Sequence, residues 1–503
     1  MKMLLTKTHQ EDIGGVLYCY DRVLISATAG TFGYPDGMGV FFNTHGYRVF
    51  DFAKVFTPVT DRIKENAEKL ASENGLEIEY IRNTRAFRKE DRIEAIVKAR
   101  GEGEGLVHIF SALELNKTYK PWHDKTSSRT YFKSDNTKCL TYYFYFIDRE
   151  FGLCFIRVPT IAPYKMDFYF NGHNWLETKL KKRGIPYEKT DNAFTYIADF
   201  EEAQKLSDQI RVEDLHRALD IFIKRYCPMP EEWGLSYNYS IVQVEYALDI
   251  LCKSEEALKP LYDNIIKTAM HTVTPENIAN FLGKRFSVLF EGEAGSRLGR
   301  RILGTRIKHQ MGEISVKIYD KFGKILRIEV TSNDVSQLKV FREVQKRDGS
   351  IVNEVAPVKK SIYSLFALVS VFKNACNRYL EFISSFDDPT DGLKKLDRVT
   401  ETVTENDKNY KGFNFFDKDD EKILLTVADG KFTLKGITNK ALRSSWPDKK
   451  PWQISRILKR LRLHGLIKKV GSTYKYYLTS LGKQVIVAGL SFRNMSLVPA
   501  LCV

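Results

Sequence analysis

The sequence predicts an α+β protein of several domains, with an N-terminal α/β layer domain, central antiparallel sheet domains and a separate basic domain at the end. Three observations support this class. The chain has 503 residues, several times the roughly 100–200 residues of a single domain. Strand-like and helix-like segments alternate in its first part, and alternating strands joined by short turns dominate its middle. The basic residues gather near its end.

In chain order, the expected parts are an α/β domain, a hairpin-rich α+β domain, a sheet-plus-helix domain, a polar linker and the basic domain. Their predicted ranges are 1–130, 131–230, 231–395, 396–412 and 413–503.

In the first domain, strand and helix patterns alternate, and both helices end at a glycine. The predicted strands are 14–28, 76–81 and 106–112, and the predicted helices are 60–73 and 89–100.

The second domain is predicted to hold two hairpins, within 139–158 and 186–197, and helices at 174–183 and 200–207. In the third, strand 239–251 alternates between apolar and polar residues, a hairpin joins 314–319 to 325–330, and 359–385 is helical.

Composition narrows the class of protein. Hydrophobic residues make up 43% of the chain and charged residues 28%, as in ordinary globular proteins. The seven cysteines form no C-x-x-C pair, which argues against a disulfide framework or a cysteine zinc site and indicates a reducing compartment. The sequence has no signal-peptide core and no long apolar run. We therefore expect a cytoplasmic protein without a membrane partner.

Charge is distributed unevenly. The chain carries 78 Lys and Arg against 63 Asp and Glu, a net charge of +15. The last 55 residues contain eleven Lys or Arg and no acid, so residues 1–448 hold 67 bases against 63 acids, a net of only +4. An acid-free basic stretch predicts a polyanion-binding surface at the end of the chain.

One face of the third predicted sheet is polar. Its carboxylates are hard ligands suited to Mg²⁺ or Mn²⁺, namely Glu245, Asp249 and Glu329. Tyr319 offers a nucleophilic hydroxyl, and the cations that could offset charge on a phosphate are Lys317, Lys321 and Arg327. These residues predict metal-dependent phosphodiester chemistry. The alternative interpretation is a solvated face held by cross-strand salt bridges.

The acidic strand 244–250, followed by 318–321 and 326–330, resembles a pattern in rolling-circle replication initiators of plasmids and phages. The resemblance implies that Tyr319 attacks DNA, with Glu245, Asp249 and Glu329 as metal ligands. We also predict that Arg327 is a catalytic residue. The His-hydrophobe-His motif of the commonest initiator class is absent from the sequence.

A second pair of acids offers another candidate. Asp21 on the first strand and Glu114 after a later strand could be the paired acids of an RNase-H-like nuclease, although two acids at strand ends also occur by chance.

Aromatic and basic residues are interleaved at 119–125 and 168–175, and the second stretch precedes Lys181 and Lys182. Such stretches predict surfaces that stack bases and follow phosphates, or else strand aromatics that belong to the core. His123 and His173 are candidate acid–base groups, with a structural role as the alternative.

In the basic domain, the apolar residues of 451–464 recur at helical spacing, Gly465 ends the helix, and two short strands follow at 466–470 and 473–479. Together with two shorter helices upstream, this order resembles the winged helix-turn-helix domains of MarR-like regulators. The resemblance implies a recognition helix and a wing that contact DNA through Arg456, Lys459, Arg460, Lys468, Lys469 and Lys475.

The sequence therefore predicts a nucleic-acid-binding protein of mobile-element or phage type that recognises a DNA site through a winged helix and nicks it with Mg²⁺ or Mn²⁺. The alternative is a non-catalytic binder, either a transcriptional regulator or the protein partner of a structured RNA. DNA is favoured over RNA as the partner, and either function is compatible with a homo-oligomer.

Overall fold

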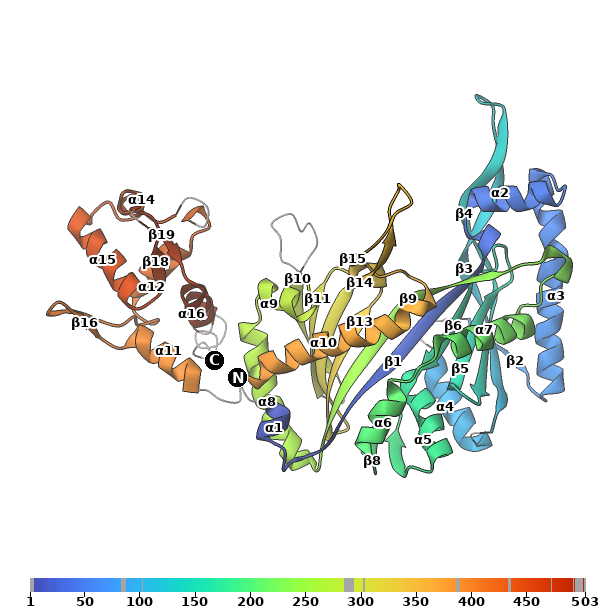
Figure 1. The fold of residues 1–503 in the computed structure, drawn as a ribbon, viewed down its shortest axis with the longest axis horizontal. Coiled ribbons are helices and arrows are strands. Elements are labelled where there is room, and N and C mark those ends of the chain that lie inside the picture. Colours follow the sequence, from blue (N-terminus) through green and yellow to red (C-terminus); the bar gives the residue numbers. More distant parts are fainter. Residues whose placement is uncertain are drawn as a thin grey trace. The chain divides into compact units, whose positions relative to one another are not determined.

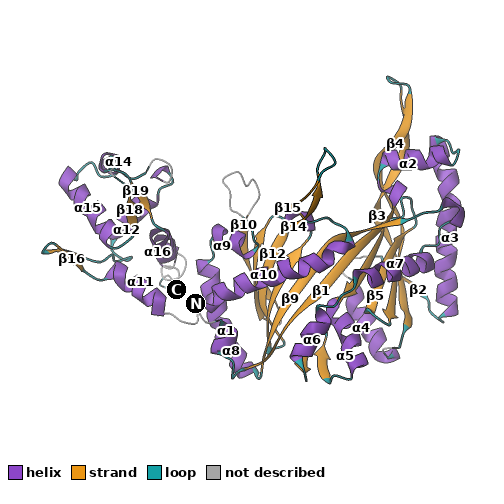
Figure 2. Ribbon diagram, in the orientation of Figure 1, coloured by secondary structure: helices purple, strands orange, loops and turns teal. Residues whose placement is uncertain are grey.

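The computed structural model describes residues 4–82, 87–101, 103–284, 294–301, 304–385, 390–432, 436–471, 473–491, 493 and 501. Helices and strands both contribute large parts of the chain, which confirms the α+β class (Figure 2). Within these ranges no helix is both long enough and apolar enough to cross a membrane.

The chain divides into two compact units. We call the first the sheet unit; it comprises His9–Lys259 and Pro275–Tyr379. We call the second the C-terminal unit; it comprises Met1–Thr8, Pro260–Thr274 and Leu380–Val503.

A single sheet of eleven described strands organises the sheet unit (Figure 1). All neighbours in it are antiparallel except β2 and β3. In spatial order the strands are β10 (Ala294–Arg301), β11 (Gly304–Met311), β12 (Ile314–Lys321), β13 (Ile325–Ser332), β9 (Tyr237–Cys252), β1 (Ile13–Ala29), β6 (Met166–Asn171), β5 (Gly152–Pro159), β4 (Arg129–Asp148), β3 (Gly105–Asp124) and β2 (Ile78–Tyr80).

The helices are given next in chain order. Up to α10 they are α1 (Leu5–Thr8), α2 (Pro35–Thr44), α3 (Phe52–Glu73), α4 (Lys89–Arg100), α5 (Gly172–Arg183), α6 (Phe200–Ser207), α7 (Val212–Tyr226), α8 (Glu255–Thr272), α9 (Pro275–Phe281) and α10 (Leu365–Ser384). Short 3₁₀ helices lie at Gly30–Gly33, Val49–Asp51, Glu231–Trp233, Val335–Gln337 and Ile362–Ser364. Two separate hairpins are formed by β7 (Tyr187–Thr190) with β8 (Ala193–Ile197) and by β14 (Lys339–Gln345) with β15 (Ile351–Pro357).

The domain boundaries predicted at residues 130 and 230 are wrong, because one sheet joins all three predicted domains. β4 runs across the first boundary, and β1 pairs with β6 on one side and β9 on the other. The N-terminal part is therefore not a separate α/β layer. Periodicity identifies strands but not their partners, and the pairing of Ile13 with Cys252 joins residues far apart in the chain.

The two faces of the sheet around β9 differ in character. On one face, Tyr246 of β9 and Tyr20 of β1 pack against Phe372 of α10, with ring centroids 5.9 and 6.5 Å away. Residues on the same strand point alternately to opposite faces, so Glu245 and Asp249 of β9 face away from α10. This alternation, predicted from the sequence, leaves a polar face for the candidate site.

The C-terminal unit continues the chain with short elements. They are α11 (Thr390–Thr400), β16 (Val403–Glu405), β17 (Lys408–Tyr410), α12 (Lys418–Ala428), α14 (Asn439–Arg443), α15 (Pro451–Leu463), β18 (Ile467–Lys469), β19 (Tyr476–Leu478) and α16 (Ser480–Ser491). Ile454, Leu458 and Leu461 of α15 are buried in its core with Leu424 and Trp446.

The polar linker predicted at 396–412 is wrong, since α11 and the hairpin of β16 and β17 occupy this range. Its buried residues Val399 and Tyr410 are spaced among charged side chains, so composition alone concealed them.

Candidate functional site

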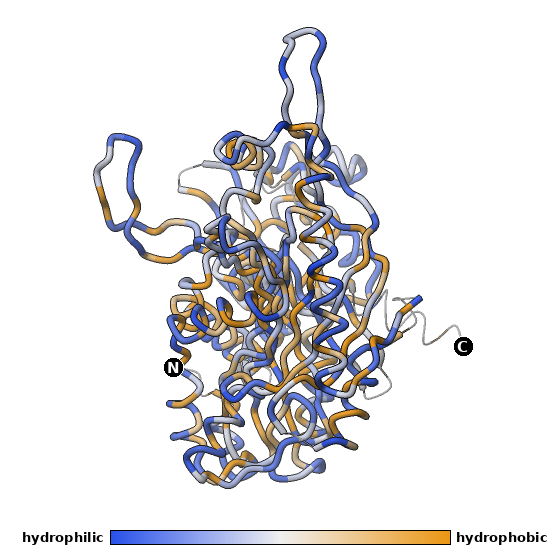
Figure 3. The backbone as a smooth tube through the Cα atoms, turned by 90° about the vertical axis from the view of Figure 1, so that its right-hand side faces the viewer, coloured by the Kyte–Doolittle hydropathy of each residue, from blue (hydrophilic) through white to orange (hydrophobic). Residues whose placement is uncertain are grey.

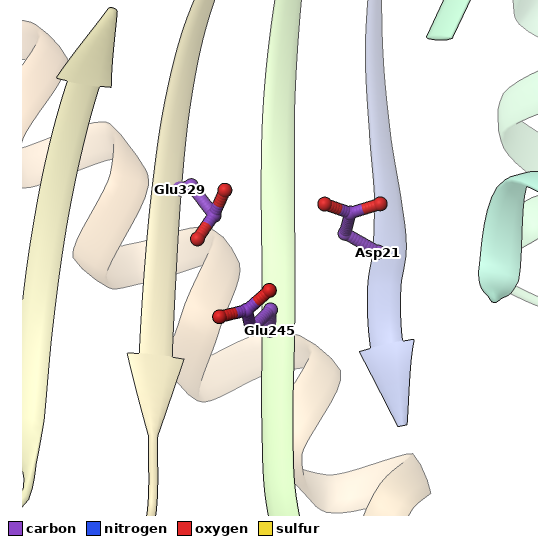
Figure 4. Close-up of side chains that lie close together, drawn as sticks. All are labelled: Asp21, Glu245 and Glu329. Atoms are coloured by element: carbon purple, nitrogen blue, oxygen red, sulfur yellow. The ribbon is translucent and has the colours of Figure 1, made fainter. Parts of the chain in front are cut away.

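Three carboxylates meet on the polar face of the sheet. Asp21 of β1, Glu245 of β9 and Glu329 of β13 each offer an oxygen, and these atoms all lie within 4.8 Å of one another (Figure 4). We call them the acidic cluster. The sequence predicted two of these residues for this site but assigned Asp21 to a different one.

A bulge in β1 helps to bring Asp21 into the cluster. The register between β1 and β9 shifts between Tyr20 and Val23, so Asp21 and Arg22 lie across from Glu245. Such bulges redirect a side chain and are frequent beside active sites. On the other side of β9, Thr331 pairs with Glu245, and Glu329 lies two residues earlier on the same face of β13.

Asp249, the third predicted metal ligand, is bound to Arg327 instead. Arg327 Nε and Nη2 each donate to one oxygen of Asp249, both at 2.6 Å. Burial raises the pKa of the Asp249 carboxyl, but Arg327 and His173 outweigh it and lower that pKa to about 2. The structure thus places Asp249 beside the acidic cluster rather than in it.

Arg327 was predicted to contact a phosphate, but its side chain is 0% exposed. Besides Asp249 it contacts Asp21, with Nη1 3.4 Å from Oδ2, and the carbonyl of Asn192 at 2.7 Å. Arg327 therefore holds the acids in position and does not face a ligand. Burial opposes ionisation of Asp21, yet Arg327 and His173 keep its pKa well below the ordinary range.

His173 is buried beside Asp21 and Asp249. It is 0% exposed, with Nδ1 3.3 Å from Asp21 and Nε2 3.5 Å from Asp249. The chain enters α5 here, where the Asn171 side chain accepts from the His173 backbone N–H. His123, the other predicted acid–base candidate, lies outside the site on the β3–β4 hairpin, bonded to Thr130.

Tyr319 contacts the acidic cluster directly. Its hydroxyl donates to Glu329 Oε2 at 2.6 Å. Burial, and next the Glu329 charge, raise the pKa of Tyr319 well above its usual value. Lys317, across from Glu329 on β12, donates to Glu329 and to Glu245, the latter at 3.3 Å. The predicted nucleophile and two of the three predicted carboxylates, Glu245 and Glu329, are therefore brought together.

The charge of the two glutamates is not fully balanced. Burial, and next the Glu329 carboxylate, raise the pKa of Glu245 despite the Lys317 ammonium. An additional cation at this point would relieve the repulsion, so the donor set fits a hard divalent ion. Among the described residues, the acidic cluster is the group whose geometry suits such a metal.

Two cations on β11 were missed by sequence reasoning. Arg306 pairs with Tyr319 and Lys308 with Lys317, so both lie on the face of the acidic cluster. Arg306 Nε is buried without a hydrogen-bond partner among the described residues. The alternation of polar and other residues at 306–310 was the sequence signal that could have revealed these cations. Lys321, predicted for phosphate, is instead bonded to Asp191 and Asn192.

The Asp21–Glu114 pair is not supported. Glu114 of β3 accepts from Arg157 at 2.9 Å and from Tyr143 at 2.7 Å. Four strand spacings separate β3 from β1, roughly 19 Å at about 4.8 Å each. These two acids cannot share a metal ion.

The predicted basic residues of the C-terminal unit divide into two groups. Arg460 is buried and pairs with Asp420 through two contacts of 2.6 and 2.8 Å, so its predicted nucleic-acid contact is wrong. Lys459 pairs with Glu405 at 2.6 Å. The remaining predicted residues are exposed, namely Arg456, Lys468, Lys469 and Lys475.

Two exposed aromatic residues accompany them. Trp452 on α15 is 61% exposed and lies one turn before Arg456, and Tyr474, between β18 and β19, is 85% exposed. Elsewhere, Lys181 and Lys182 on α5 are exposed but paired with Glu177 and Glu150. These pairings reduce the positive charge expected of that helix.

No family model, curated protein or solved structure matches this chain. Function is therefore argued from the geometry of the site.

Proposed function

We propose that this protein binds nucleic acid and cuts one strand of DNA in a reaction that depends on Mg²⁺ or Mn²⁺, with Tyr319 as the nucleophile. The observation that carries the proposal is the hydrogen bond from the Tyr319 hydroxyl to Glu329, 2.6 Å long, within a cluster of three carboxylates. A nucleophile, a proton acceptor and hard metal ligands meet in one place.

The residues suggest a balanced reaction. Tyr319 Oη attacks phosphorus as its proton passes to Glu329, and the bond from phosphorus to the departing sugar oxygen breaks. Lys317, an ammonium bonded to the same glutamates, can return a proton to that oxygen. Arg306 is placed to pair with a phosphate oxygen. A metal ion held by Asp21, Glu245 and Glu329 would offset charge on the phosphate and favour the tyrosinate.

For the C-terminal unit we propose a winged helix that recognises the nucleic acid. Helices α12 and α14 precede the basic helix α15, and the hairpin of β18 and β19 follows it, which is the order of a winged helix-turn-helix domain. Arg456 on α15 and Lys468, Lys469 and Lys475 beside the hairpin provide exposed positive charge. Such a reaction on a recognised site would suit an initiator of a mobile element or phage.

One observation favours a second candidate, the non-catalytic binder. Lys317 already pairs with Glu245 and Glu329, so the polar face can be held together without a metal ion. In that case the sheet unit would serve only as a docking surface.

The test is a cleavage assay on single-stranded, duplex and hairpin DNA with Mg²⁺, with Mn²⁺ and with a chelator. We expect nicking only with metal, and its loss in Tyr319→Phe. Tyr80→Phe, an exposed tyrosine on β2 at the far edge of the sheet, is the matched control and should cut normally. Wild-type protein that cuts none of these substrates would favour the non-catalytic binder, and full activity in Tyr319→Phe would remove the tyrosine mechanism.

A further inference from the structure

The hairpin of β3 and β4 extends well beyond the sheet as a two-stranded ribbon (Figure 1). On its outer sides, β2 pairs with β3 only up to Ser111, and β5 pairs with β4 only from Thr141 onward. Residues 113–124 and 129–140 therefore have no other strand beside them in the sheet. We call this segment the ribbon; it projects at the top of Figure 3, where its tip is mostly hydrophilic.

One face of the ribbon is anchored by packing. Phe132 is 3% exposed and lies 4.9 Å from the Phe42 ring of α2 and 5.5 Å from the Phe52 ring of α3. Tyr119 is 2% exposed, and its hydroxyl donates to the Phe32 carbonyl at 2.8 Å. A free two-stranded ribbon is marginally stable in water, so these contacts fix its base and its orientation.

The opposite face is open and carries aromatic rings. Trp122 pairs with Tyr131 across the strands, and they are 42% and 37% exposed. Lys133, two residues along the same face, places Nζ 3.7 Å from the centre of the Trp122 ring. Exposed apolar groups that lie side by side with polar residues around them can mark an interaction site.

Charge is concentrated here as well. Residues 117–138 contain six Lys or Arg and two Asp, a net of +4, which equals the net charge of the whole of residues 1–448. The remainder of that stretch is therefore neutral in sum. The bases are Lys117, Lys120, Lys125, Arg129, Lys133 and Lys138. Lys120 forms a salt bridge with Asp135 at 3.3 Å.

We propose that the ribbon is a second nucleic-acid-binding site, which takes unpaired bases. Trp122 and Tyr131 would stack on bases, while Lys125, Arg129 and Lys133 contact the neighbouring phosphates. Rings interleaved with cations are the surface that single strands require, because every base presents a π-face and every link a charge. An acidic peptide would be attracted by the cations but would leave the two rings uncovered.

This site rests on nucleic acid being the partner of the protein, but not on cleavage by Tyr319 or on binding by the C-terminal unit. The sheet unit would then bind a nucleic-acid strand through a site of its own.

Tryptophan fluorescence tests the proposal on the full chain. Of the five tryptophans, Trp175, Trp233 and Trp446 are buried, whereas Trp122 and Trp452 are exposed, one on the ribbon and one on α15. In the Trp452→Phe variant, the fluorescence of Trp122 reports binding at the ribbon. In the Trp122→Phe variant, the fluorescence of Trp452 reports binding at the C-terminal unit.

We expect a deoxythymidine oligomer to quench the tryptophan fluorescence of the Trp452→Phe variant until it reaches saturation. A duplex of equal length should quench this fluorescence far less. Adding Tyr131→Ala should weaken the affinity at least about fivefold, the loss of one stacked base. Replacing Lys125, Arg129 and Lys133 together by Ala should reduce the slope of log affinity against log salt by about 2. Circular dichroism and the thermal melting curve check that each variant is folded.

The outcomes separate this site from the proposed function. If the oligomer quenches the fluorescence of the Trp122→Phe variant but not that of the Trp452→Phe variant, the ribbon site is overturned and the proposed winged helix is retained. Absence of quenching and of filter binding in both would remove nucleic acid as the partner altogether. Quenching of Trp452→Phe by poly-glutamate but not by the oligomer would also overturn the proposal, in favour of an acidic peptide.

Discussion

The surroundings of Glu245 disfavour its ionised form and raise its pKa. The Glu329 carboxylate and burial act together against its ionised form, and Lys317 compensates only in part. A carboxylate in such an unfavourable electrostatic environment is common at ligand-binding sites. It lowers the stability of the fold until a bound cation supplies the missing positive charge.

This imbalance predicts an unusual variant. Because the pKa of Glu245 is raised above its ordinary 4.5 in the fold, its favourable contribution is present at acid pH and is lost as pH rises through the folded value. Glu245→Gln should therefore melt at a higher temperature than the wild type at neutral pH without metal. Mn²⁺ should raise the melting temperature of the wild type and leave that of the variant unchanged.

Glu188→Gln, an exposed glutamate on β7, is the matched control and should behave as the wild type with and without Mn²⁺. A Glu245→Gln protein that melts lower, or that still responds to Mn²⁺, would contradict the assignment of Glu245 as an uncompensated ligand. Differential scanning calorimetry in a chelating buffer gives both measurements.

At the scale of elements, the basic residues of helix α15 differ in burial. The sequence placed Arg456, Lys459 and Arg460 on one exposed basic face, because helical spacing distinguishes faces but not the depth of each residue. Arg460 lies at the margin of that face, where Asp420 and the carbonyls of Lys411 and Gly412 surround it. Only the packing of a distant helix, α12, assigns it to the core.

Arg460→Ala and Arg456→Ala should therefore differ. The first leaves Asp420 buried without its partner and should destabilise the C-terminal unit by about 3–5 kcal/mol. The second should leave the free energy of unfolding unchanged and reduce the salt slope of duplex binding by about 0.9. Urea unfolding and a salt titration of binding give the two quantities.

Equal loss of stability in both variants would show that Arg456 is also structural. Unchanged binding by a stable Arg456→Ala protein would contradict a recognition role for α15.

Other elements were predicted well where local signals are strong. α4 and α6 have the bounds expected from their periodicity and from the Asp199 cap. β3 and β4 were predicted far too short. The parts of these strands that extend beyond the sheet have a polar sequence typical of loops. On the packed face of the ribbon the buried apolar side chains are few, Tyr119 and Phe132 among them, so the alternation that identifies a half-buried strand is weak there.

For the whole molecule, β1 connects the two halves of the sheet. It supplies Asp21 to the acidic cluster, although nearly 225 positions separate Asp21 from Glu245 in the sequence. Glu329 and Tyr319 could be predicted because both lie in one hairpin with a clear polar face. Asp21 could not, because its neighbours depend on a long-range pairing and on a bulge that local patterns do not encode.

Charge is also organised at this scale. Residues 117–138 carry a net charge of +4, equal to that of the whole of residues 1–448, and the last 55 residues carry +11. These two basic stretches lie in different compact units of the chain.

The most direct test of the central claim is to locate the covalent bond to DNA. Wild-type protein incubated with Mn²⁺ and a nicked or single-stranded substrate would be digested with trypsin and nuclease and analysed by mass spectrometry. The account predicts a nucleotide attached to the peptide Ile318–Lys321, whose one tyrosine is Tyr319. A nucleotide attached to any other residue, or cleaved DNA without an attached peptide, would contradict it.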